Sequence, residues 1–218
     1  MTNTGPEWLR EYMRLVLSLA AAIALAVAMV ISVLAVPKPA DAATTLVTKS
    51  FSNTTLITIP GSGEDGPASP YPSSITASFP IGSTVRDVNV VLRGYTHTWP
   101  DDVDVLLVHG ERNRTILSDA GGERDVNNIT LKLDDEALNG LRNDSQLTGG
   151  TFKPSNFDGG DTFSSPAPNP ASPNPALSGF DGMGARGVWK LFVQDDNFFD
   201  SGSFARGWTI QIRAAVPQ

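Results

Sequence analysis

Carboxylate side chains are the residues of this 218-residue chain with the clearest capacity for chemistry, because many of them share predicted loops. The clusters are Asp101-Asp102 with Asp104, Asp119, Asp125, Asp134-Asp135-Glu136, and Asp195-Asp196 with Asp200. Calcium takes about six to eight oxygen ligands from carboxylates, carbonyls and water, and paired loop carboxylates supply such ligands. We therefore expect one or more structural Ca²⁺ sites, and the best candidate ligands are Asp102, Asp119, Asp195 and Asp196.

Other interpretations of these carboxylates stay open. None of the clusters has the spacing of an EF-hand, since Phe199 takes the fifth position of a loop that begins at Asp195. Aspartates also cap turns and keep a surface charged without binding any ion. A glycosidase with two paired carboxylates is a further alternative, because a sequence does not give the distance between them.

Nucleophilic catalysis finds little support in the sequence. A serine hydrolase needs a histidine base within hydrogen-bond reach of the nucleophile and a carboxylate that orients the base. The chain has two histidines, His97 and His109, and no Gly-x-Ser-x-Gly motif. We expect the His97 ring to be structural, bonded to a loop carbonyl or carboxylate, and His109 to be an exposed turn residue. Cysteine is absent, which excludes thiol nucleophiles, disulfides and thiolate metal sites.

Aromatic side chains form the second set of binding candidates. Trp189 and Trp208 belong to apolar strand patterns, so we expect them in the core. Trp99, Phe198 and Phe199 stand in predicted loops instead. We expect these three to be exposed and able to bind a ligand, such as the face of a sugar ring.

Composition limits the classes of partner. The formal net charge is −7 and the chain has no basic stripe. Since neutralisation of phosphates supplies most of the affinity for nucleic acids, we expect no nucleic-acid partner. The 20 glycines and 16 prolines favour a turn-rich β protein over a helical bundle.

The first 42 residues differ from the rest of the chain. Residues 15–36 carry no charge and, at about 1.5 Å per residue, are long enough to cross a bilayer. Ala40-Asp41-Ala42 fits the small-x-small pattern that signal peptidases cut. Two interpretations stay open, a cleaved signal peptide and an uncleaved N-terminal membrane anchor. Both place residues 43–218 outside the cytoplasm, either secreted or held at the outer side of the cell membrane through residues 15–36.

Short strand-like segments separated by Gly, Asp, Asn and Pro turns fill residues 43–218. In the clearest of them, residues 85–95, Val88, Val90 and Leu92 share one face. No crossover helices are available for a parallel α/β sheet, so we expect an all-β, antiparallel sandwich or jelly roll after one N-terminal hydrophobic helix. The Pro-rich loop 164–176 is expected to be extended and solvated.

Four pieces of this part of the chain follow the order of a known family. They are Ile75–Phe79 with Val85–Leu92, then Tyr95–Leu107, then Leu177–Gly182 with Gly187–Asp196, and last Gly202–Ile212. In this order the chain resembles the P domain (P/Homo B domain) of proprotein convertases and of many secreted bacterial proteins. It departs from the family at Asp101, where many members have glycine, and in its Pro-rich loop.

The resemblance implies a jelly-roll β-sandwich of the galactose-binding-like type. In the convertases this domain follows a subtilisin-like serine protease domain and stabilises it. We therefore expect an exported, non-catalytic module for stabilisation or interaction, whose protein partner is a separately encoded subtilisin-like protease. The alternatives are a carbohydrate-binding jelly roll, with a glycan at Trp99, Phe198 and Phe199, and a hydrolase.

Overall fold

The computed structural model describes residues 6–19, 43–60 and 64–218. The chain divides into two compact units, residues 1–42 and residues 43–218. In the first unit, residues 7–19 are helical. Among the described residues, no helix has the length and apolar character needed to cross a membrane. The predicted apolar segment 15–36 lies mostly outside the described residues, so its role as a signal peptide or anchor stays a prediction.

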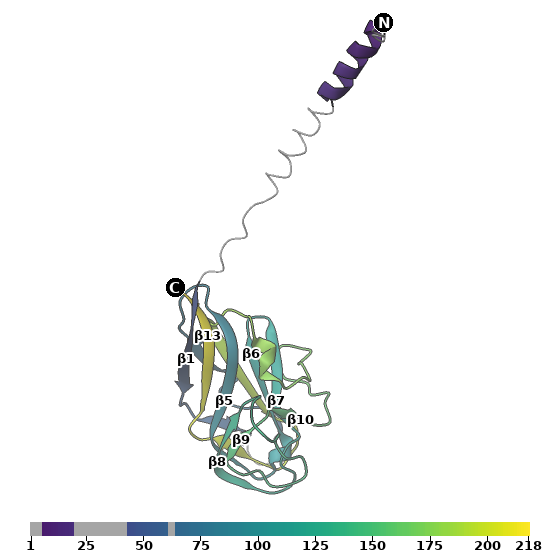
Figure 1. Ribbon diagram of the computed structural model, residues 1–218. Coiled ribbons are helices and arrows are strands. Elements are labelled where there is room, and N and C mark those ends of the chain that lie inside the picture. The colour runs from purple at the N-terminus through teal and green to yellow at the C-terminus, as the bar shows by residue number, and fades with distance from the viewer. Residues whose placement is uncertain (1–5, 20–42, 61–63) are drawn as a thin grey trace. The chain divides into compact units, whose positions relative to one another are not determined.

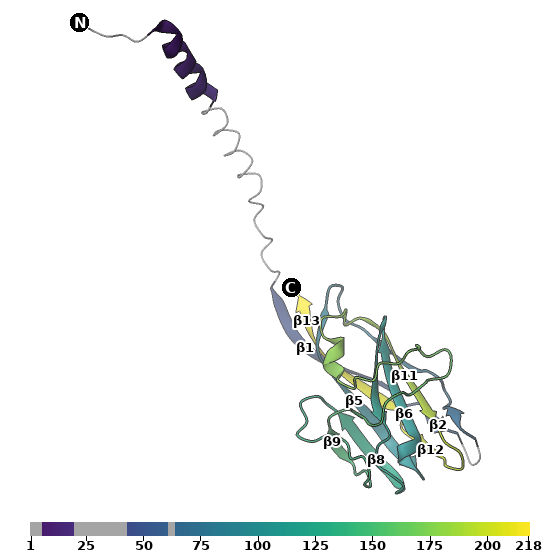
Figure 2. The same cartoon turned by 90° about the vertical axis from the view of Figure 1, so that its right-hand side faces the viewer.

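The second unit is built from two β-sheets (Figures 1 and 2). The first sheet contains β1 (Thr44–Asn53), β2 (Ile57–Ile59), β5 (Thr84–His97), β8 (Val126–Leu133), β9 (Gly150–Phe152), β12 (Gly202–Phe204) and β13 (Trp208–Pro217). Its strand order is β1-β13-β5-β12-β2, with β8 beside β5 and β9 beside β8. The long strand β5 therefore organises this sheet, because three strands pair with it.

The second sheet has six strands. They are β3 (Gly66–Pro67), β4 (Ser73–Ala77), β6 (Val103–His109), β7 (Arg112–Ser118), β10 (Ser155–Asn156) and β11 (Gly187–Asp195). The order is β10-β7-β6-β11-β3, with β4 also beside β11. Two short 3₁₀ helices, Pro100–Asp102 and Leu177–Phe180, complete the regular structure of this unit.

One hydrophobic core lies between the two sheets. Val88, Val90 and Leu92 of β5 are buried, as their alternation predicts. They share a cluster of buried side chains with Leu107 of β6 and Leu191 of β11. All members of this cluster belong to residues 43–218, so this unit has its own core and is suitable for production alone. The predicted all-β architecture is confirmed at this level.

The expectation of purely antiparallel sheets is wrong at two places. Strand β9 runs parallel to β8, with Leu131 opposite Gly150, and β10 runs parallel to β7. Parallel neighbours need a crossover of about a dozen residues or more, and the irregular segment 134–149 supplies one between β8 and β9. The sheets are therefore mixed, although most of their pairs are antiparallel.

The Pro-rich loop 164–176 does not lie free in solvent as predicted. Its Ala167 and Ala171 pack with the preceding Phe163 against an apolar cluster on the outer face of the second sheet, which includes Leu106 and Phe192. One backbone hydrogen bond, from the Thr115 N–H of β7 to the Ser172 carbonyl (3.1 Å), joins the loop to the sheet. Without the loop, the apolar cluster on this face would be exposed. The loop is thus a cover for the sheet.

Candidate functional site

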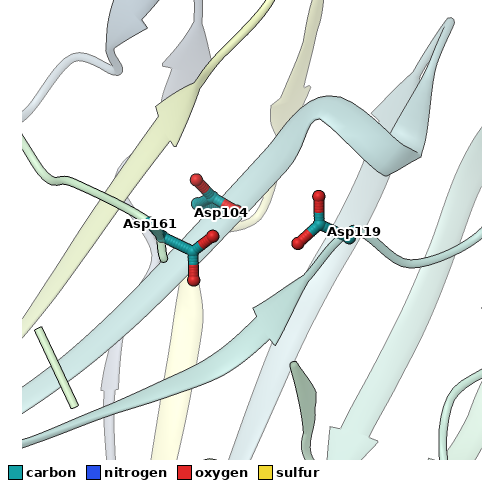
Figure 3. Close-up of side chains that lie close together, drawn as sticks. All are labelled: Asp104, Asp119 and Asp161. Atoms are coloured by element: carbon teal, nitrogen blue, oxygen red, sulfur yellow. The ribbon is translucent and has the colours of Figure 1, made fainter. Parts of the chain in front are cut away.

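Three aspartates converge beside the start of strand β6. Asp104, Asp119 and Asp161 each offer a carboxylate oxygen, and these oxygens all lie within 4.8 Å of one another (Figure 3). Calcium–oxygen distances are about 2.3–2.6 Å, so two ligands of one ion are separated by at most about 5 Å. The three carboxylates are therefore close enough to share a single cation.

Each of the three aspartates comes from a different part of the fold. Asp104 stands between Val103 and Val105, which face the core, so the alternation of the strand sends its side chain to the outer face of the second sheet. Asp119 directly follows β7 and adopts φ 48°, a left-handed conformation that aspartate tolerates better than most residues. Asp161 belongs to the segment that leads into the Pro-rich loop.

Neighbouring side chains hold two of these carboxylates in place. The Gln194 amide on β11 donates to Asp104 Oδ2 (3.3 Å) and to the Thr162 carbonyl (2.9 Å). The Ser118 hydroxyl donates to Asp119 Oδ2 (2.7 Å). The glutamine therefore connects the buried strand carboxylate with the loop that carries the third aspartate.

An open cavity of about 240 Å³ surrounds the aspartates. Its walls add the carboxylates of Asp158 and Asp196, so five aspartates line it. None of the described residues that line it is basic. Such a concentration of negative charge is unfavourable without a counter-ion, which a divalent cation supplies.

Burial and repulsion from neighbouring carboxylates raise the pKa values of Asp104, Asp119 and Asp196. Burial raises the pKa of Asp104 to about 8, and the nearby Asp161 adds to the shift. Burial, with Asp119 as the next cause, raises the pKa of Asp196 to about 6. The pKa of Asp119 is also raised, first by burial. The metal-free site therefore holds protons that a bound cation would displace.

Only part of the predicted ligand set belongs to this group. Asp119 is one of the three converging aspartates, and Asp196 lines the cavity. Asp102 and Asp195 do not line the cavity. Burial is the main cause that raises the pKa of Asp102 to about 7, and repulsion from Asp195 is the second. The prediction did not include Asp104 or Asp161, although Asp104 gave a signal as the one charged residue in an otherwise apolar strand.

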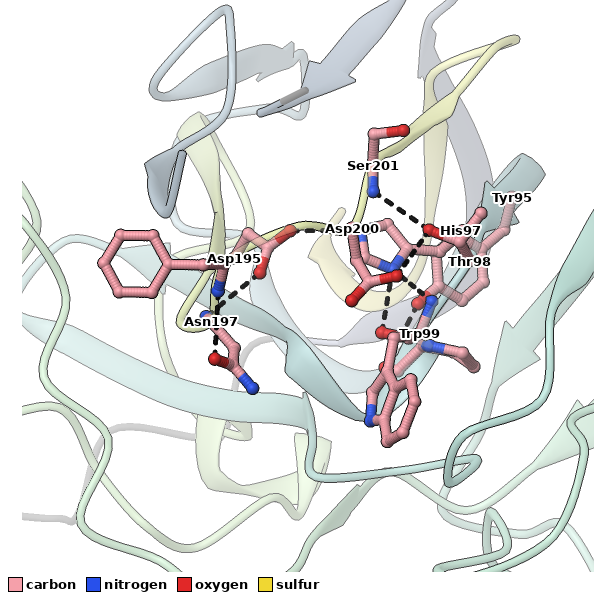
Figure 4. Close-up of polar contacts among 10 residues, drawn as sticks. Tyr95, His97, Thr98, Trp99, Asp195, Asn197, Asp200 and Ser201 are labelled. Atoms are coloured by element: carbon pink, nitrogen blue, oxygen red, sulfur yellow. Dashed lines mark hydrogen bonds and ion pairs between the residues drawn. The ribbon is translucent and has the colours of Figure 1, made fainter. Parts of the chain in front are cut away.

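His97 belongs to a cluster of polar contacts in which His97 and Asp195 are buried (Figure 4). Its Nδ1 lies 2.8 Å from the Trp99 carbonyl oxygen, and its Nε2 lies 3.2 Å from Asp195 Oδ2. The ring is fully buried. The expectation of a structural histidine bonded to a loop carbonyl or carboxylate is confirmed at Nδ1, whereas Nε2 faces the Asp195 carboxylate without a hydrogen bond.

The prediction of an exposed His109 is wrong. His109 is the last residue of β6 and lies opposite Trp189 in the sheet, while the turn begins only at Gly110. Its ring stacks on the Trp189 indole with centroids 4.0 Å apart. Its Nδ1 and Nε2 lie 3.0 Å and 2.8 Å from the carbonyl oxygens of Val188 and Gly184. Position in the sheet explains the burial.

The three predicted aromatic binding residues are exposed, whereas Trp189 and Trp208 are buried in the core as predicted. Trp99 is 38% exposed, Phe198 50% and Phe199 83%. Hydrogen bonds from the Thr98 hydroxyl to Asp200 Oδ1 (2.8 Å) and from the Ser201 N–H to the Thr98 hydroxyl (3.1 Å) join the segments that carry them. The aromatics therefore stand on adjoining loops.

Comparison with known proteins gives no match for this chain among family models, curated proteins or solved structures. The resemblance to the P/Homo B domain therefore rests on the order of the sequence features alone. What the structure supports directly is a β protein of two mixed sheets with an acidic cavity near the start of β6.

Proposed function

We propose that residues 43–218 are an exported, non-catalytic module of the P/Homo B type, which binds and stabilises a separately encoded subtilisin-like protease and is itself stabilised by Ca²⁺. The observation that carries the proposal is the convergence of Asp104, Asp119 and Asp161 in an acidic cavity of a two-sheet β protein. The jelly-roll, galactose-binding-like topology is part of the same proposal.

Calcium is the cation that fits this donor set best. All groups that line the cavity offer oxygen, and the five carboxylates can supply several of the six to eight ligands that Ca²⁺ takes. Softer metals prefer imidazole and thiolate ligands, and the chain has no cysteine. Magnesium requires near-ideal octahedral geometry and keeps several waters, so it usually takes only one or two carboxylates, whereas five line this cavity.

The engagement of both histidines supports a non-catalytic role. A general base needs a ring nitrogen within hydrogen-bond reach of the nucleophile. In His97 the two nitrogens face the Trp99 carbonyl and Asp195, and in His109 both face backbone carbonyls. These are the two histidines of the chain, so a Ser-His-Asp hydrolase is disfavoured as an alternative.

Calcium binding at pH 7 is expected to release about one proton per ion. The pKa of Asp104, raised by burial to about 8, keeps that carboxyl mostly protonated in the metal-free protein, and the ion must displace the proton. Calorimetric titration in buffers of different ionisation enthalpy measures the number of protons released. The number should fall towards zero at about pH 9, above the raised pKa. Heats that do not depend on the buffer at pH 7 would contradict the assignment.

The partnership is tested with the subtilisin-like proteases that the same host exports. Residues 43–218 should form a complex with one of them and raise the midpoint of its thermal inactivation in the presence of Ca²⁺. The D104N/D119N double variant should stabilise the protease less. If no exported subtilisin-like protease co-elutes with residues 43–218 in size-exclusion chromatography, the proposed partnership is wrong.

A carbohydrate-binding module is the second candidate, and the conformation of Phe199 favours it. This side chain is 83% exposed, and its backbone has φ 82°, a left-handed conformation that costs a bulky residue about 1–3 kcal/mol. Neither packing against the core nor backbone preference accounts for an exposed aromatic residue at this position, whereas contact with a ligand would account for it.

Glycan binding would depend on the exposed aromatics. Phe199→Gly should abolish binding on a glycan array and leave the fold intact, because glycine adopts positive φ without strain. Leu138→Ala is the matched control, since Leu138 is a highly exposed hydrophobic side chain on another loop. An array on which the unmodified residues 43–218 bind nothing would remove this second candidate.

A further inference from the structure

A second cavity lies at the other end of the outer face of the second sheet. It has a volume of about 480 Å³ and lies where β6 ends and β11 begins. Asp104 and His109 stand near opposite ends of β6, so this cavity is about 16 Å along the strand from the acidic one. Its size is within the range of small-molecule sites. Neither the metal proposal nor the aromatic loops use it.

The lining of this second cavity is basic. Arg186 and Lys190 contribute exposed cationic side chains, and the described residues around the cavity include no carboxylate. Within residues 6–19, 43–60 and 64–218, neither of these two side chains makes an ion pair or a hydrogen bond. In a chain of net charge −7, two unpaired cations beside one cavity form a local site of opposite sign.

His109 lies at the end of β6 beside this cavity. Both of its ring nitrogens lie within 3.0 Å of backbone carbonyl oxygens, which only accept hydrogen bonds. Backbone carbonyls therefore face both ring nitrogens. No carboxylate among the described residues forms an ion pair with it.

The backbone around His109 leaves room for its ring. Gly187 has φ 135°, and a Cβ at that position would lie 3.2 Å from His109 Cε1. The Trp189 indole covers one face of the ring, with an angle of 3° between the two planes. The histidine ring is therefore held between the Gly187 backbone and the Trp189 indole, which belongs to the core. Val188, 45% exposed, gives the same cavity an apolar wall.

We infer that the cavity bounded by Arg186, Val188 and Lys190 binds a carboxylate group. The arginine fork matches the two oxygens of a carboxylate, and the lysine adds a point charge. The exposed Val188 side chain would contact the apolar part of the ligand. Two sources present such a group at this size, an acidic sugar and the carboxyl terminus of a peptide.

The inference is tested by NMR titration of residues 43–218 at constant ionic strength, with D-glucuronate and N-acetylglycine as the two carboxylate probes and glucose as the neutral control. The amide signals of Gly110, Gly184 and Gly187 should shift with at least one carboxylate probe and stay unchanged with glucose. The probe that binds more tightly identifies the source of the carboxylate.

Variants separate this site from general charge effects. The R186Q/K190Q double variant should weaken binding about tenfold or more, because it removes both charge-assisted contacts to the carboxylate. The R142Q/K153Q control removes the same charge from exposed positions outside the cavity and should bind as before. Absence of shifts at about 10 mM of either probe, or equal weakening in both double variants, would overturn the inference.

Discussion

Residues 43–218 should melt at a higher temperature in Ca²⁺ than in EDTA. An ion that binds only the folded form stabilises it, by about 2.7 kcal/mol when its concentration is a hundred times the dissociation constant. For a domain of this size, that corresponds to a shift of about 5–11 °C in the melting temperature. Differential scanning calorimetry in both conditions measures the shift.

The size of the calcium effect should depend on pH. The folded-state pKa of Asp104 lies at about 8, above the value of about 3.9 for an unfolded aspartate. Its contribution to the stability of the metal-free protein is therefore complete below about pH 4 and is lost as the pH rises through 8. We expect the difference between Ca²⁺ and EDTA to be larger at pH 8.5 than at pH 6.

Asparagine variants identify the ligands that cause the effect. Asp104→Asn and Asp119→Asn should each remove most of the calcium-dependent shift, and Asp104→Asn should stabilise the metal-free protein at pH 8 because it removes a buried charge. Asp125→Asn, at an exposed position outside the acidic cavity, is the control and should retain the full shift. Identical melting curves in Ca²⁺ and EDTA at pH 8.5 would show that the cavity binds no calcium.

The second large effect is expected at the buried pair of His97 and Asp195. Asp195→Ala should lower the free energy of unfolding by about 3–5 kcal/mol, because it leaves the buried imidazole without the carboxylate that lies 3.2 Å from Nε2. The loss should extend to the surrounding loop, since Asp195 Oδ1 also accepts a hydrogen bond from the Asn197 N–H (3.1 Å). Urea denaturation measures the change.

A double variant separates the loss of the pair from the loss of packing. In H97F/D195L both polar partners are replaced by apolar side chains, and the cost should be clearly smaller than for Asp195→Ala alone. Asp125→Ala is the surface control and should change stability by less than about 0.5 kcal/mol. An Asp195→Ala variant as stable as the control would mean that the pair does not stabilise the fold.

Much of the sheet structure was predictable because it is encoded locally. The alternation of Val88, Val90 and Leu92 specifies which face of β5 is buried, and the structure places all three in the core. Trp189 and Trp208 are buried for the same reason. Local patterns did not predict the parallel pairing of β9 and β10, because that depends on where a long irregular segment returns to the sheet.

The candidate metal site was predictable only in part, since its members come from distant segments. Asp119 was predicted as a ligand because it follows a strand, and Asp196 because it stands in a loop beside another aspartate. Asp161 follows a Gly-Gly pair far along the chain, and it reaches Asp104 only because the loop that begins there folds over the sheet. The composition of the Pro-rich loop predicted a solvated segment. The structure shows instead that the loop packs on the outer face of the second sheet.

The most direct measurement is a crystal structure of residues 43–218 grown with millimolar Ca²⁺. We predict one ion in the acidic cavity, about 2.3–2.6 Å from carboxylate oxygens of Asp104, Asp119 and Asp161, in a protein of two face-to-face β-sheets. A cavity that holds only water at that calcium concentration, or aspartates too far apart to share an ion, would contradict the proposed calcium site.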